Sequence, residues 1–436
     1  MTRRPALSSD TRKLFAAQGL RAFAYGFGAL LLGTTLRHRG LSSLEVGGVL
    51  GAVVAGTVFT SFGVARYAER FGRRRCYLLL YLVLGAAGAV FALTSALWAL
   101  LLAGLSGTLS ADIVDSGPCT SLEQAMLGTD VAGRERIRGF GLYNAVAAAA
   151  GSLGALAAGG PAVLRHLLPR LPVDQRFFLL FVPVGLAGAA IARSLSERVE
   201  LEPSLSPRGG RLDRSRGVVA RLAALFATDS FAGGFVVPAF IAYWLAAHFD
   251  ASTAALGLLF FGIGLLQTVS FLLAVRLAER FGLLATMVCS HLPSNLLLAA
   301  VPFAPSLPVA VVLLLARSML SQMDVPTRQA YVMALVDPAE RAAAAGYTNG
   351  ARYTTRPLGP VLAGASQGLL LGMPFFVAGG VKVAYDLTLW RWFRRVPLPD
   401  EDDVPTDPNA ELPPSGGATN GSVAFKIRST ASKEGR

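Results

Sequence analysis

Charged side chains interrupt several long apolar stretches of this sequence, and they are the residues best suited to chemistry. A charge in the apolar core of a bilayer is costly unless it faces a partner or a water-filled cavity, so each one marks a candidate functional position. The carboxylates can accept protons, and the planar guanidinium groups can bind anions through paired hydrogen bonds. The candidates are Arg21, Asp112, Asp115, Asp229, Arg317, Asp324, Arg352 and Arg356, followed by Lys382 and Asp386.

The spacing of the last four candidates is informative. Arg352 and Arg356 are four residues apart and therefore share one face of a helix. Two neighbouring guanidinium groups predict a site for carboxylate or phosphate oxygens. The alternative is that these arginines pair with a buried carboxylate such as Asp324 or Asp386. Lys382 and Asp386 are also four residues apart, and we expect them to neutralise each other.

The composition places these charges in a lipid bilayer. Of the 436 residues, 53% are hydrophobic and 15% are charged, and the mean hydropathy is +0.51. So little polar surface cannot cover a soluble globule of this length. The net charge of +13 does not indicate a nucleic-acid partner, because the arginines lie in short clusters between apolar stretches, as membrane topology requires.

Apolar stretches of about 20 residues, the length that spans a bilayer, predict an all-α protein with twelve transmembrane helices in two bundles of six. The helices are expected to begin near Leu14, Ser43, Arg75, Leu97, Arg136, Gln175, Val218, Ser252, Leu284, Leu307, Arg341 and Pro374. The bundles occupy residues 14–195 and 218–395 and are joined by a polar, Pro- and Gly-rich linker at 196–217. Residues 1–13 form a short tail, and the acidic, Pro-rich residues 396–436 predict a disordered one.

Lysine and arginine are concentrated in alternate loops, together with the two tails. Because basic loops stay on the cytoplasmic side, we expect both termini in the cytoplasm and the protein in the plasma membrane. The N-terminal residues run into the first apolar stretch without a small-residue cleavage site, which argues against a removable signal peptide.

The sequence contains an internal repeat. The string AERFG occurs at Ala68–Gly72 and at Ala278–Gly282, each time after a long apolar stretch and close to a matching arginine, Arg66 or Arg276. Two parallel halves predict a central site at their interface, near the middle of the membrane.

Aligning the halves through this repeat shows that some buried charges change sign between them. The reversed pairs of positions are Arg21 and Asp229, Asp112 and Arg317, and Glu123 and Arg328. If the first and fourth helices of each half touch, Arg21 can pair with Asp112 or Asp115. The corresponding pair in the second half is Asp229 with Arg317. These pairs are either purely structural or contain a carboxylate that binds a proton or cation when its pair opens.

The repeated loop resembles a motif of the major facilitator superfamily, close to G-x-x-x-D-R-x-G-R-R, between helices 2 and 3. Residues 65–74 here read ARYAERFGRR, with Ala65 and Glu69 in place of the usual glycine and aspartate. The resemblance implies that helices 1, 4, 7 and 10 line a central cavity and that the loops gate it through ion pairs. Such pairs form in one packing of the halves and break in the other. The expected gating residues are Arg66, Glu69, Arg70, Gly72, Arg73, Arg74, Glu279 and Arg280. The alternative is that these arginines only anchor helix ends.

The resemblance further implies a secondary transporter that works by alternating access. We expect proton-coupled efflux of a small organic solute by a monomer. Gly359–Gly364 resembles the glycine-proline signature that antiporters of the family carry in helix 5, although helix 5 here lacks the proline. The alternatives are uptake or facilitated diffusion of an organic anion and a non-transporting sensor with the same fold.

Catalytic and cofactor-binding patterns are not found. There is no G-x-x-x-x-G-K-[ST] pattern for ATP. The histidines lie mostly at the ends of predicted spans without metal-ligand spacing, and they are His38, His166, His248 and His291. We therefore expect no enzyme, no metal and no cofactor.

Overall fold

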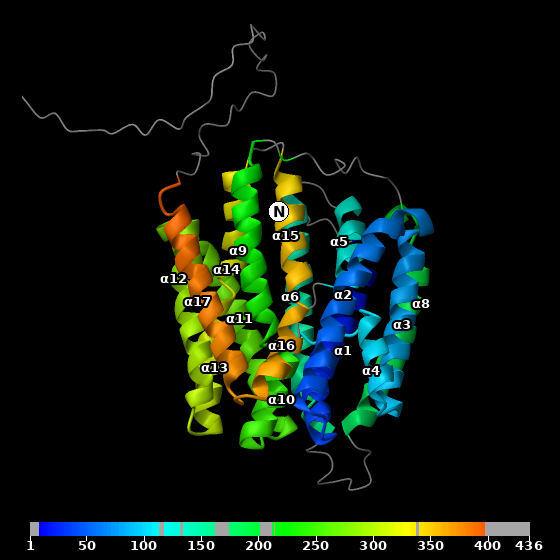
Figure 1. Cartoon of the computed structure of the whole chain (residues 1–436). Coiled ribbons are helices and arrows are strands. Elements are labelled where there is room, and N and C mark those ends of the chain that lie inside the picture. The colour runs from blue at the N-terminus through cyan, green and yellow to red at the C-terminus, as the bar shows by residue number, and fades with distance from the viewer. Residues whose placement is uncertain are drawn as a thin grey trace, which may run out of the picture. The chain divides into compact units, whose positions relative to one another are not determined.

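The computed structural model describes residues 8–112, 117–130, 134–161, 174–200, 212, 214–336 and 340–396. Every regular element in these ranges is a helix (Figure 1). One compact unit, Met1–Val396, contains the helices of the described residues, and Pro397–Arg436 form a second unit. The predicted disordered tail beyond Val396 and most of the predicted linker lie outside the described residues.

The helices before the predicted linker are grouped here as the first half. They are α1 (Ser9–His38), α2 (Ser43–Phe71), α3 (Arg73–Leu93), α4 (Leu97–Leu105), α5 (Pro118–Asp130), α6 (Arg134–Ala157), η1 (Asp174–Leu180), α8 (Phe181–Ser194) and η2 (Glu197–Glu200).

The later helices form the second half. They are α9 (Arg216–Gly234), α10 (Pro238–Phe249), α11 (Thr253–Phe281), α12 (Leu283–Ala300), η3 (Val301–Phe303), α13 (Leu307–Ser321), α14 (Asp324–Leu335), α15 (Arg341–Thr355), α16 (Leu358–Gln367) and α17 (Met373–Phe393).

Four of the predicted helices are each divided in two, giving the pairs α4/α5, α9/α10, α13/α14 and α15/α16. Gly107, with φ of +69°, follows α4 in a conformation that glycine adopts easily. Pro238 begins α10, and Pro357 directly precedes α16. Because proline lacks the backbone donor of a continuous helix, it breaks or kinks the helix at these points.

Length and apolarity support a membrane-spanning body. Eight segments among the described residues are long and apolar enough to cross a membrane: Ser9–His38, Ser43–Ala68, Arg73–Leu93, Gln175–Ser194, Arg216–Phe249, Thr253–Phe271, Leu283–Phe303 and Leu307–Leu335. The count of twelve spans stays a prediction.

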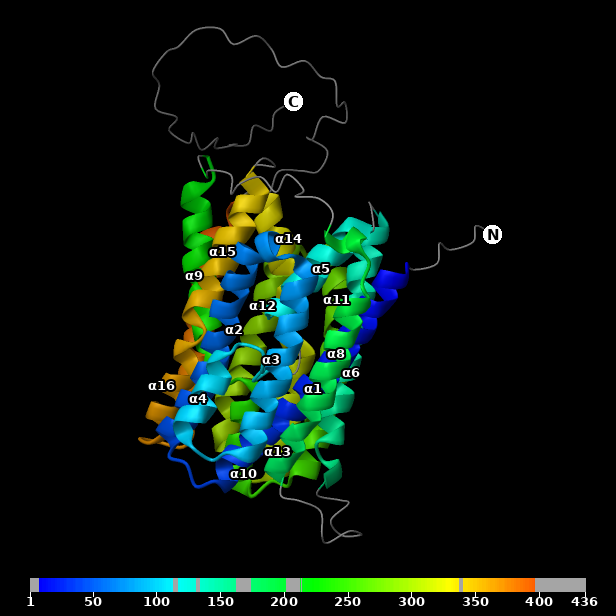
Figure 2. The same cartoon turned by 90° about the vertical axis from the view of Figure 1, so that its right-hand side faces the viewer.

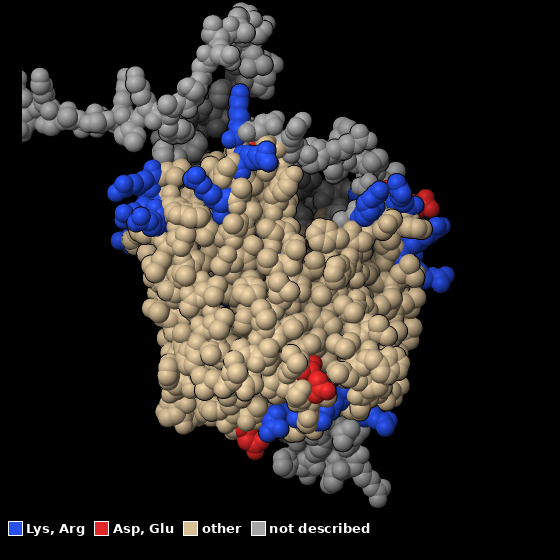
Figure 3. Space-filling model, viewed as in Figure 1, with Lys and Arg blue, Asp and Glu red and all other residues tan. Residues whose placement is uncertain are grey.

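The outer surface fits a bilayer. Large apolar side chains such as Phe59, Trp98 and Phe303 are 69%, 69% and 76% exposed. Figure 3 shows a wide band with hardly any charged residues, bordered by lysines and arginines toward both ends of the molecule. An apolar band of this kind is stable when lipid tails, not water, surround it.

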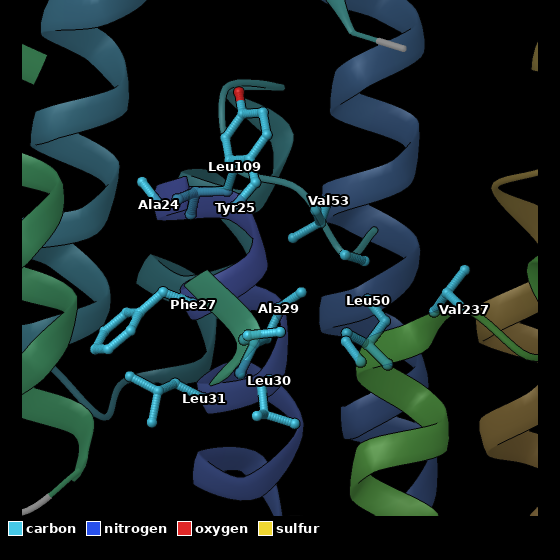
Figure 4. Close-up of a cluster of buried hydrophobic side chains, with 14 of the residues drawn as sticks. Ala24, Tyr25, Phe27, Ala29, Leu30, Leu31, Leu50, Val53, Leu109 and Val237 are labelled. Carbon is cyan, nitrogen blue, oxygen red and sulfur yellow. The ribbon is translucent and has the colours of Figure 1, made fainter. Parts of the chain in front are cut away.

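Helix α1 lies at the centre of the first half and is buried along most of its length. Figure 4 shows its apolar side chains beside Leu50 and Val53 of α2 and Val237 of the second half. Small residues let α1 approach α6 closely, because a Cβ atom on Gly26 would lie 1.9 Å from the Gly151 carbonyl oxygen.

The extensive contacts between the halves are made by α1 with α10, α2 with α16, and α6 with α11. A Cβ atom on Gly33 would lie 2.3 Å from the Ala239 carbonyl oxygen, and one on Gly364 2.2 Å from that of Ser43. Helices α10 and α16 lie at the end of the molecule opposite the first turn of α9 (Figures 1 and 2). The tight packing between the halves is therefore at that end.

Candidate functional site: buried charge clusters and a bridge between the halves

The first half contains a buried ion pair between Arg21 of α1 and Glu123 of α5. Both residues are 0% exposed, and the Arg21 Nη2 atom lies 2.6 Å from Glu123 Oε2. The hydroxyl groups of Tyr77 and Tyr143 donate hydrogen bonds to the two oxygens of the same carboxylate. A buried pair with this many hydrogen bonds keeps its charges satisfied and holds α1, α3, α5 and α6 together.

This pairing differs from the expectation that Arg21 contacts Asp112 or Asp115. Because the chain leaves the helix after α4 and resumes at Pro118, Asp112 lies in the connection and Glu123 faces α1. Asp115 lies outside the described residues.

Asp229 of α9 is the centre of a larger cluster in the second half. Its Oδ1 atom lies 2.5 Å from Lys382 Nζ and 3.9 Å from His291 Nε2. Its Oδ2 atom lies 3.7 Å from Arg328 Nη1, and Arg328 also binds Asp324 at 2.6 Å. All five residues are less than 9% exposed, so the charges neutralise one another inside the protein.

Two predicted pairs are wrong in this half. Lys382 does not neutralise Asp386, because it reaches across to α9 and Asp229. Asp386 instead accepts a hydrogen bond from Asn295 and pairs with His291 of α12. Asp229 contacts Lys382 in place of Arg317, whose buried Nε atom makes no hydrogen bond with the described residues.

The aligned positions of the two halves do form equivalent pairs, with opposite polarity. Arg21 and Glu123 are 2.6 Å apart in the first half, and their counterparts Asp229 and Arg328 are 3.7 Å apart in the second. The first and fourth helices of each half therefore touch, through α1 and α5 in the first half and α9 and α14 in the second. The sign reversal at Glu123 and Arg328 was visible in the sequence, although the expected partners of Arg21 and Asp229 were Asp112, Asp115 and Arg317.

Among the described residues, an ion pair joins the two halves. Arg356, at the end of α15, places its Nη2 atom 2.7 Å from Asp112 Oδ2, which lies beyond α4. The side chains are 28% and 24% exposed, respectively, and both line a cavity of about 30 Å³ together with Thr57, Ser110 and Tyr353. The pair crosses between the halves and is more accessible than the buried clusters.

The two candidate arginines of helix 11 have different surroundings. Arg356 pairs with Asp112 and not, as the alternative had it, with Asp324 or Asp386. Arg352 lies one turn earlier, and its buried Nε atom makes no hydrogen bond with the described residues. Its carbonyl oxygen accepts a hydrogen bond of 2.8 Å from Ser230 of α9.

The predicted gating loop is held by Glu200 of η2. The backbone amides of Arg73 and Arg74 donate hydrogen bonds of 2.7 and 3.0 Å to its carboxylate. Gly72 has φ of +90°, which confirms that glycine permits this tight loop. The side chain of Glu69 is not described.

The other expected gating residues lie around these loops. A cavity of about 760 Å³ is lined by Arg70 and Arg74, among others. The guanidinium group of Arg66 lies over the ring of Tyr67, and that of Arg280 lies over the ring of Phe281. Glu279 is exposed. Their gating role stays a prediction.

A lipid-facing helical body with two halves and buried ion pairs is typical of a multi-pass membrane protein. Residues 222–430 match the model of the Major Facilitator Superfamily, and solved transporters of that superfamily share the fold. The second half of the chain therefore matches the major facilitator superfamily, and the chain as a whole has the fold of its transporters.

Three known proteins illustrate the similarity. An uncharacterized membrane protein of Saccharomyces cerevisiae, YJR124C, is 24% identical over 421 residues, covering 88% of this chain and 93% of the yeast protein. The nucleoside transporter NupG is 14% identical with a TM-score of 0.68, covering 88% of this chain and 100% of NupG. A D-xylose-proton symporter is 16% identical with a TM-score of 0.65, covering 87% of this chain and 97% of the symporter. At these identities the two structures show a common fold.

Proposed function

We propose that this protein is a secondary active transporter that moves a small organic solute by alternating access, with efflux driven by protons. It acts as a monomer in the plasma membrane with both termini in the cytoplasm. The ion pair between Asp112 and Arg356 is the observation that carries this proposal, because it joins the two halves. Asp112 lies at the break between α4 and α5, and Arg356 lies at the break between α15 and α16.

Alternating access needs contacts between the halves that can form and break. The pair is partly exposed and lies beside a cavity of about 30 Å³ that has room for water, so water can compete for either partner. Tight packing of α10 and α16 against the first half closes one end of the interface. Rocking of the halves would separate that end while the opposite end closes.

The charge of the site favours an anionic solute. A carboxylate or phosphate can replace Asp112 as the partner of Arg356 through two parallel hydrogen bonds. Arg352 can add a second contact to the anion, because it lies one turn away. Its buried Nε atom makes no hydrogen bond with the described residues. The related structures differ in solute, since one is named for nucleosides and another for D-xylose and protons.

The test begins with a thermal-shift screen of organic anions and organic cations on the purified protein. Compounds that stabilise it are then followed as flux into proteoliposomes, with and without a pH gradient. We expect anionic hits, flux that depends on the gradient, and loss of both stabilisation and flux in Arg352→Ala and Arg356→Ala. Arg391→Ala is the matched control, because this exposed arginine lies in the last turn of α17.

Other outcomes separate the alternatives. Cationic hits that survive both arginine substitutions contradict the anion site. Flux that does not depend on the pH gradient indicates facilitated diffusion. Accumulation of the solute that is driven by the gradient and moves in the same direction as the proton indicates uptake. Binding without flux of any hit indicates a sensor that has kept the fold.

A further inference from the structure

A large cavity lies at the end of the first half where helix α3 begins. Its volume is about 760 Å³, compared with about 30 Å³ for the cavity beside the pair of Asp112 and Arg356. The lining comes from the end of α2, the start of α3, the end of α8 and the short helix η2. The charged residues of the lining are Arg70, Arg74, Arg75, Arg193, Glu197 and Glu200.

The cavity carries an excess of positive charge, since four arginines face two glutamates. The carboxylate of Glu200 is already occupied, because two backbone amides at the start of α3 donate hydrogen bonds of 2.7 and 3.0 Å to it. Arg74 donates a hydrogen bond of 3.1 Å to the Arg193 carbonyl oxygen. The guanidinium groups of Arg70, Arg75 and Arg193 form no ion pair or hydrogen bond with the described residues. These three groups can therefore bind an anion.

Two of these arginines stand at the ends of lipid-facing stripes on neighbouring helices. On α3, Arg75 is exposed, and Leu79 and Leu82 on the same helix face are 57% and 42% exposed. On α8, Arg193 is exposed, and Leu186, two turns earlier on the same face, is 60% exposed. Helices α3 and α8 pack against each other at the outer edge of the first half (Figures 1 and 2). Each helix thus offers lipid an apolar stripe that ends in an arginine.

The two arginines lie at the same level of the membrane. The hydrogen bond from Arg74 to the Arg193 carbonyl oxygen joins the start of α3 to the end of α8. Figure 3 shows basic side chains gathered at this corner, along the border of the apolar band. Arginines at such a border keep their charged ends at the depth of the lipid headgroups.

A phospholipid matches both features of this region. Guanidinium groups bind phosphate oxygens through paired hydrogen bonds, and the apolar stripes bury acyl chains. A soluble anion would gain only the contacts with the arginines, so the stripes favour a lipid. The excess of positive charge favours an anionic headgroup over a zwitterionic one.

We propose that this cavity binds the headgroup of an anionic phospholipid from the adjoining leaflet. Arg75 and Arg193 bind the phosphate, and Arg70 adds a third cation. The acyl chains lie along the exposed leucines of α3 and α8, so one lipid joins the two helices. The site is separate from the pair of Asp112 and Arg356, and it does not depend on the proposed function.

The experiment is a lipid titration of the purified full-length protein in detergent micelles. Native mass spectrometry separates the protein with a bound lipid from the protein without one. The probes are palmitoyl-oleoyl-phosphatidylglycerol, which is anionic, and the phosphatidylcholine with the same acyl chains, which is zwitterionic. We expect the wild type to bind phosphatidylglycerol more tightly than phosphatidylcholine.

The variant Arg75→Gln/Arg193→Gln locates the site. We expect its affinity for phosphatidylglycerol to fall about 30-fold, which corresponds to about 2 kcal/mol for two arginines near a membrane surface. Arg391→Gln is the matched control and should keep the affinity of the wild type. Arg391 is exposed in the last turn of α17 and does not line the cavity.

Inorganic phosphate and glycerol phosphate test whether the acyl chains matter. If either displaces phosphatidylglycerol at the concentration at which the lipid itself binds, the cavity takes a soluble anion and the proposal is wrong. Equal affinity of the wild type for the two lipids also overturns it, and this result needs no variant to fold. The third contrary result is a double variant that binds phosphatidylglycerol as the wild type does, because the lipid then binds elsewhere.

Discussion

The ion pair between Arg21 and Glu123 makes a quantitative prediction about stability. Arg21→Met leaves the Glu123 carboxylate buried at 0% exposure with only hydroxyl donors such as Tyr77 and Tyr143. Removing one partner of a buried ion pair costs about 3–5 kcal/mol, and we expect a loss in this range. The double variant Arg21→Met/Glu123→Gln removes both charges and keeps an acceptor for the tyrosines, so it should recover at least about 2 kcal/mol of that loss.

The assay is reversible unfolding in mixed detergent micelles, with the free energy of unfolding measured for both single variants and the double variant. Arg391→Met serves as the control, and a change within about 0.5 kcal/mol is expected for this exposed position. The reasoning is refuted if Arg21→Met costs less than about 1 kcal/mol, or if the losses of the single variants simply add in the double variant.

Two further predictions concern packing and capping. Gly364→Ala should lower the melting temperature and weaken the contact between α2 and α16, because its Cβ atom would lie 2.2 Å from the Ser43 carbonyl oxygen. The control Gly380→Ala should leave the melting temperature unchanged, because no atom lies within 4 Å of the added Cβ atom. An equal melting temperature for the two variants would contradict this. Ser42→Ala should cost about 1 kcal/mol of unfolding free energy, because Ser42 and Glu45 form a capping box at the start of α2. A value indistinguishable from that of Ser61→Ala, within α2, would show that the cap contributes nothing.

The sequence predicted the helical membrane fold and the places where most helices begin, because length and apolarity alone determine which stretches can span a bilayer. It did not predict the breaks within four helices. The break between α4 and α5 moved the partner of Arg21 from Asp112 to Glu123, because side-chain direction depends on where a helix resumes.

The charged sites were predicted as a set but not as pairs. Spacing suggested that Lys382 pairs with Asp386, but neighbours on one helix are weak partners when oppositely charged residues of other helices are within reach. His291 was missed because a single histidine in an apolar stretch has no distinctive pattern. The reversal of sign between aligned positions singled out Glu123 and Arg328 in the sequence, but it did not identify their partners, Arg21 and Asp229.

The central claim is that the pair between Asp112 and Arg356 holds the halves in one arrangement and that they rock when it opens. The direct test is a spin-label distance measurement by double electron–electron resonance in nanodiscs. The native cysteines, Cys76, Cys119 and Cys289, are first replaced by serine.

One label pair, at exposed Leu44 and Leu369, reports the end of the interface packed by α2 and α16. A second pair, at exposed Tyr67 and Tyr347, reports the opposite end. In Asp112→Asn we predict a longer distance for the first pair and a shorter distance for the second, relative to the wild type. Unchanged distances at both ends, or lengthening at both, would contradict the account.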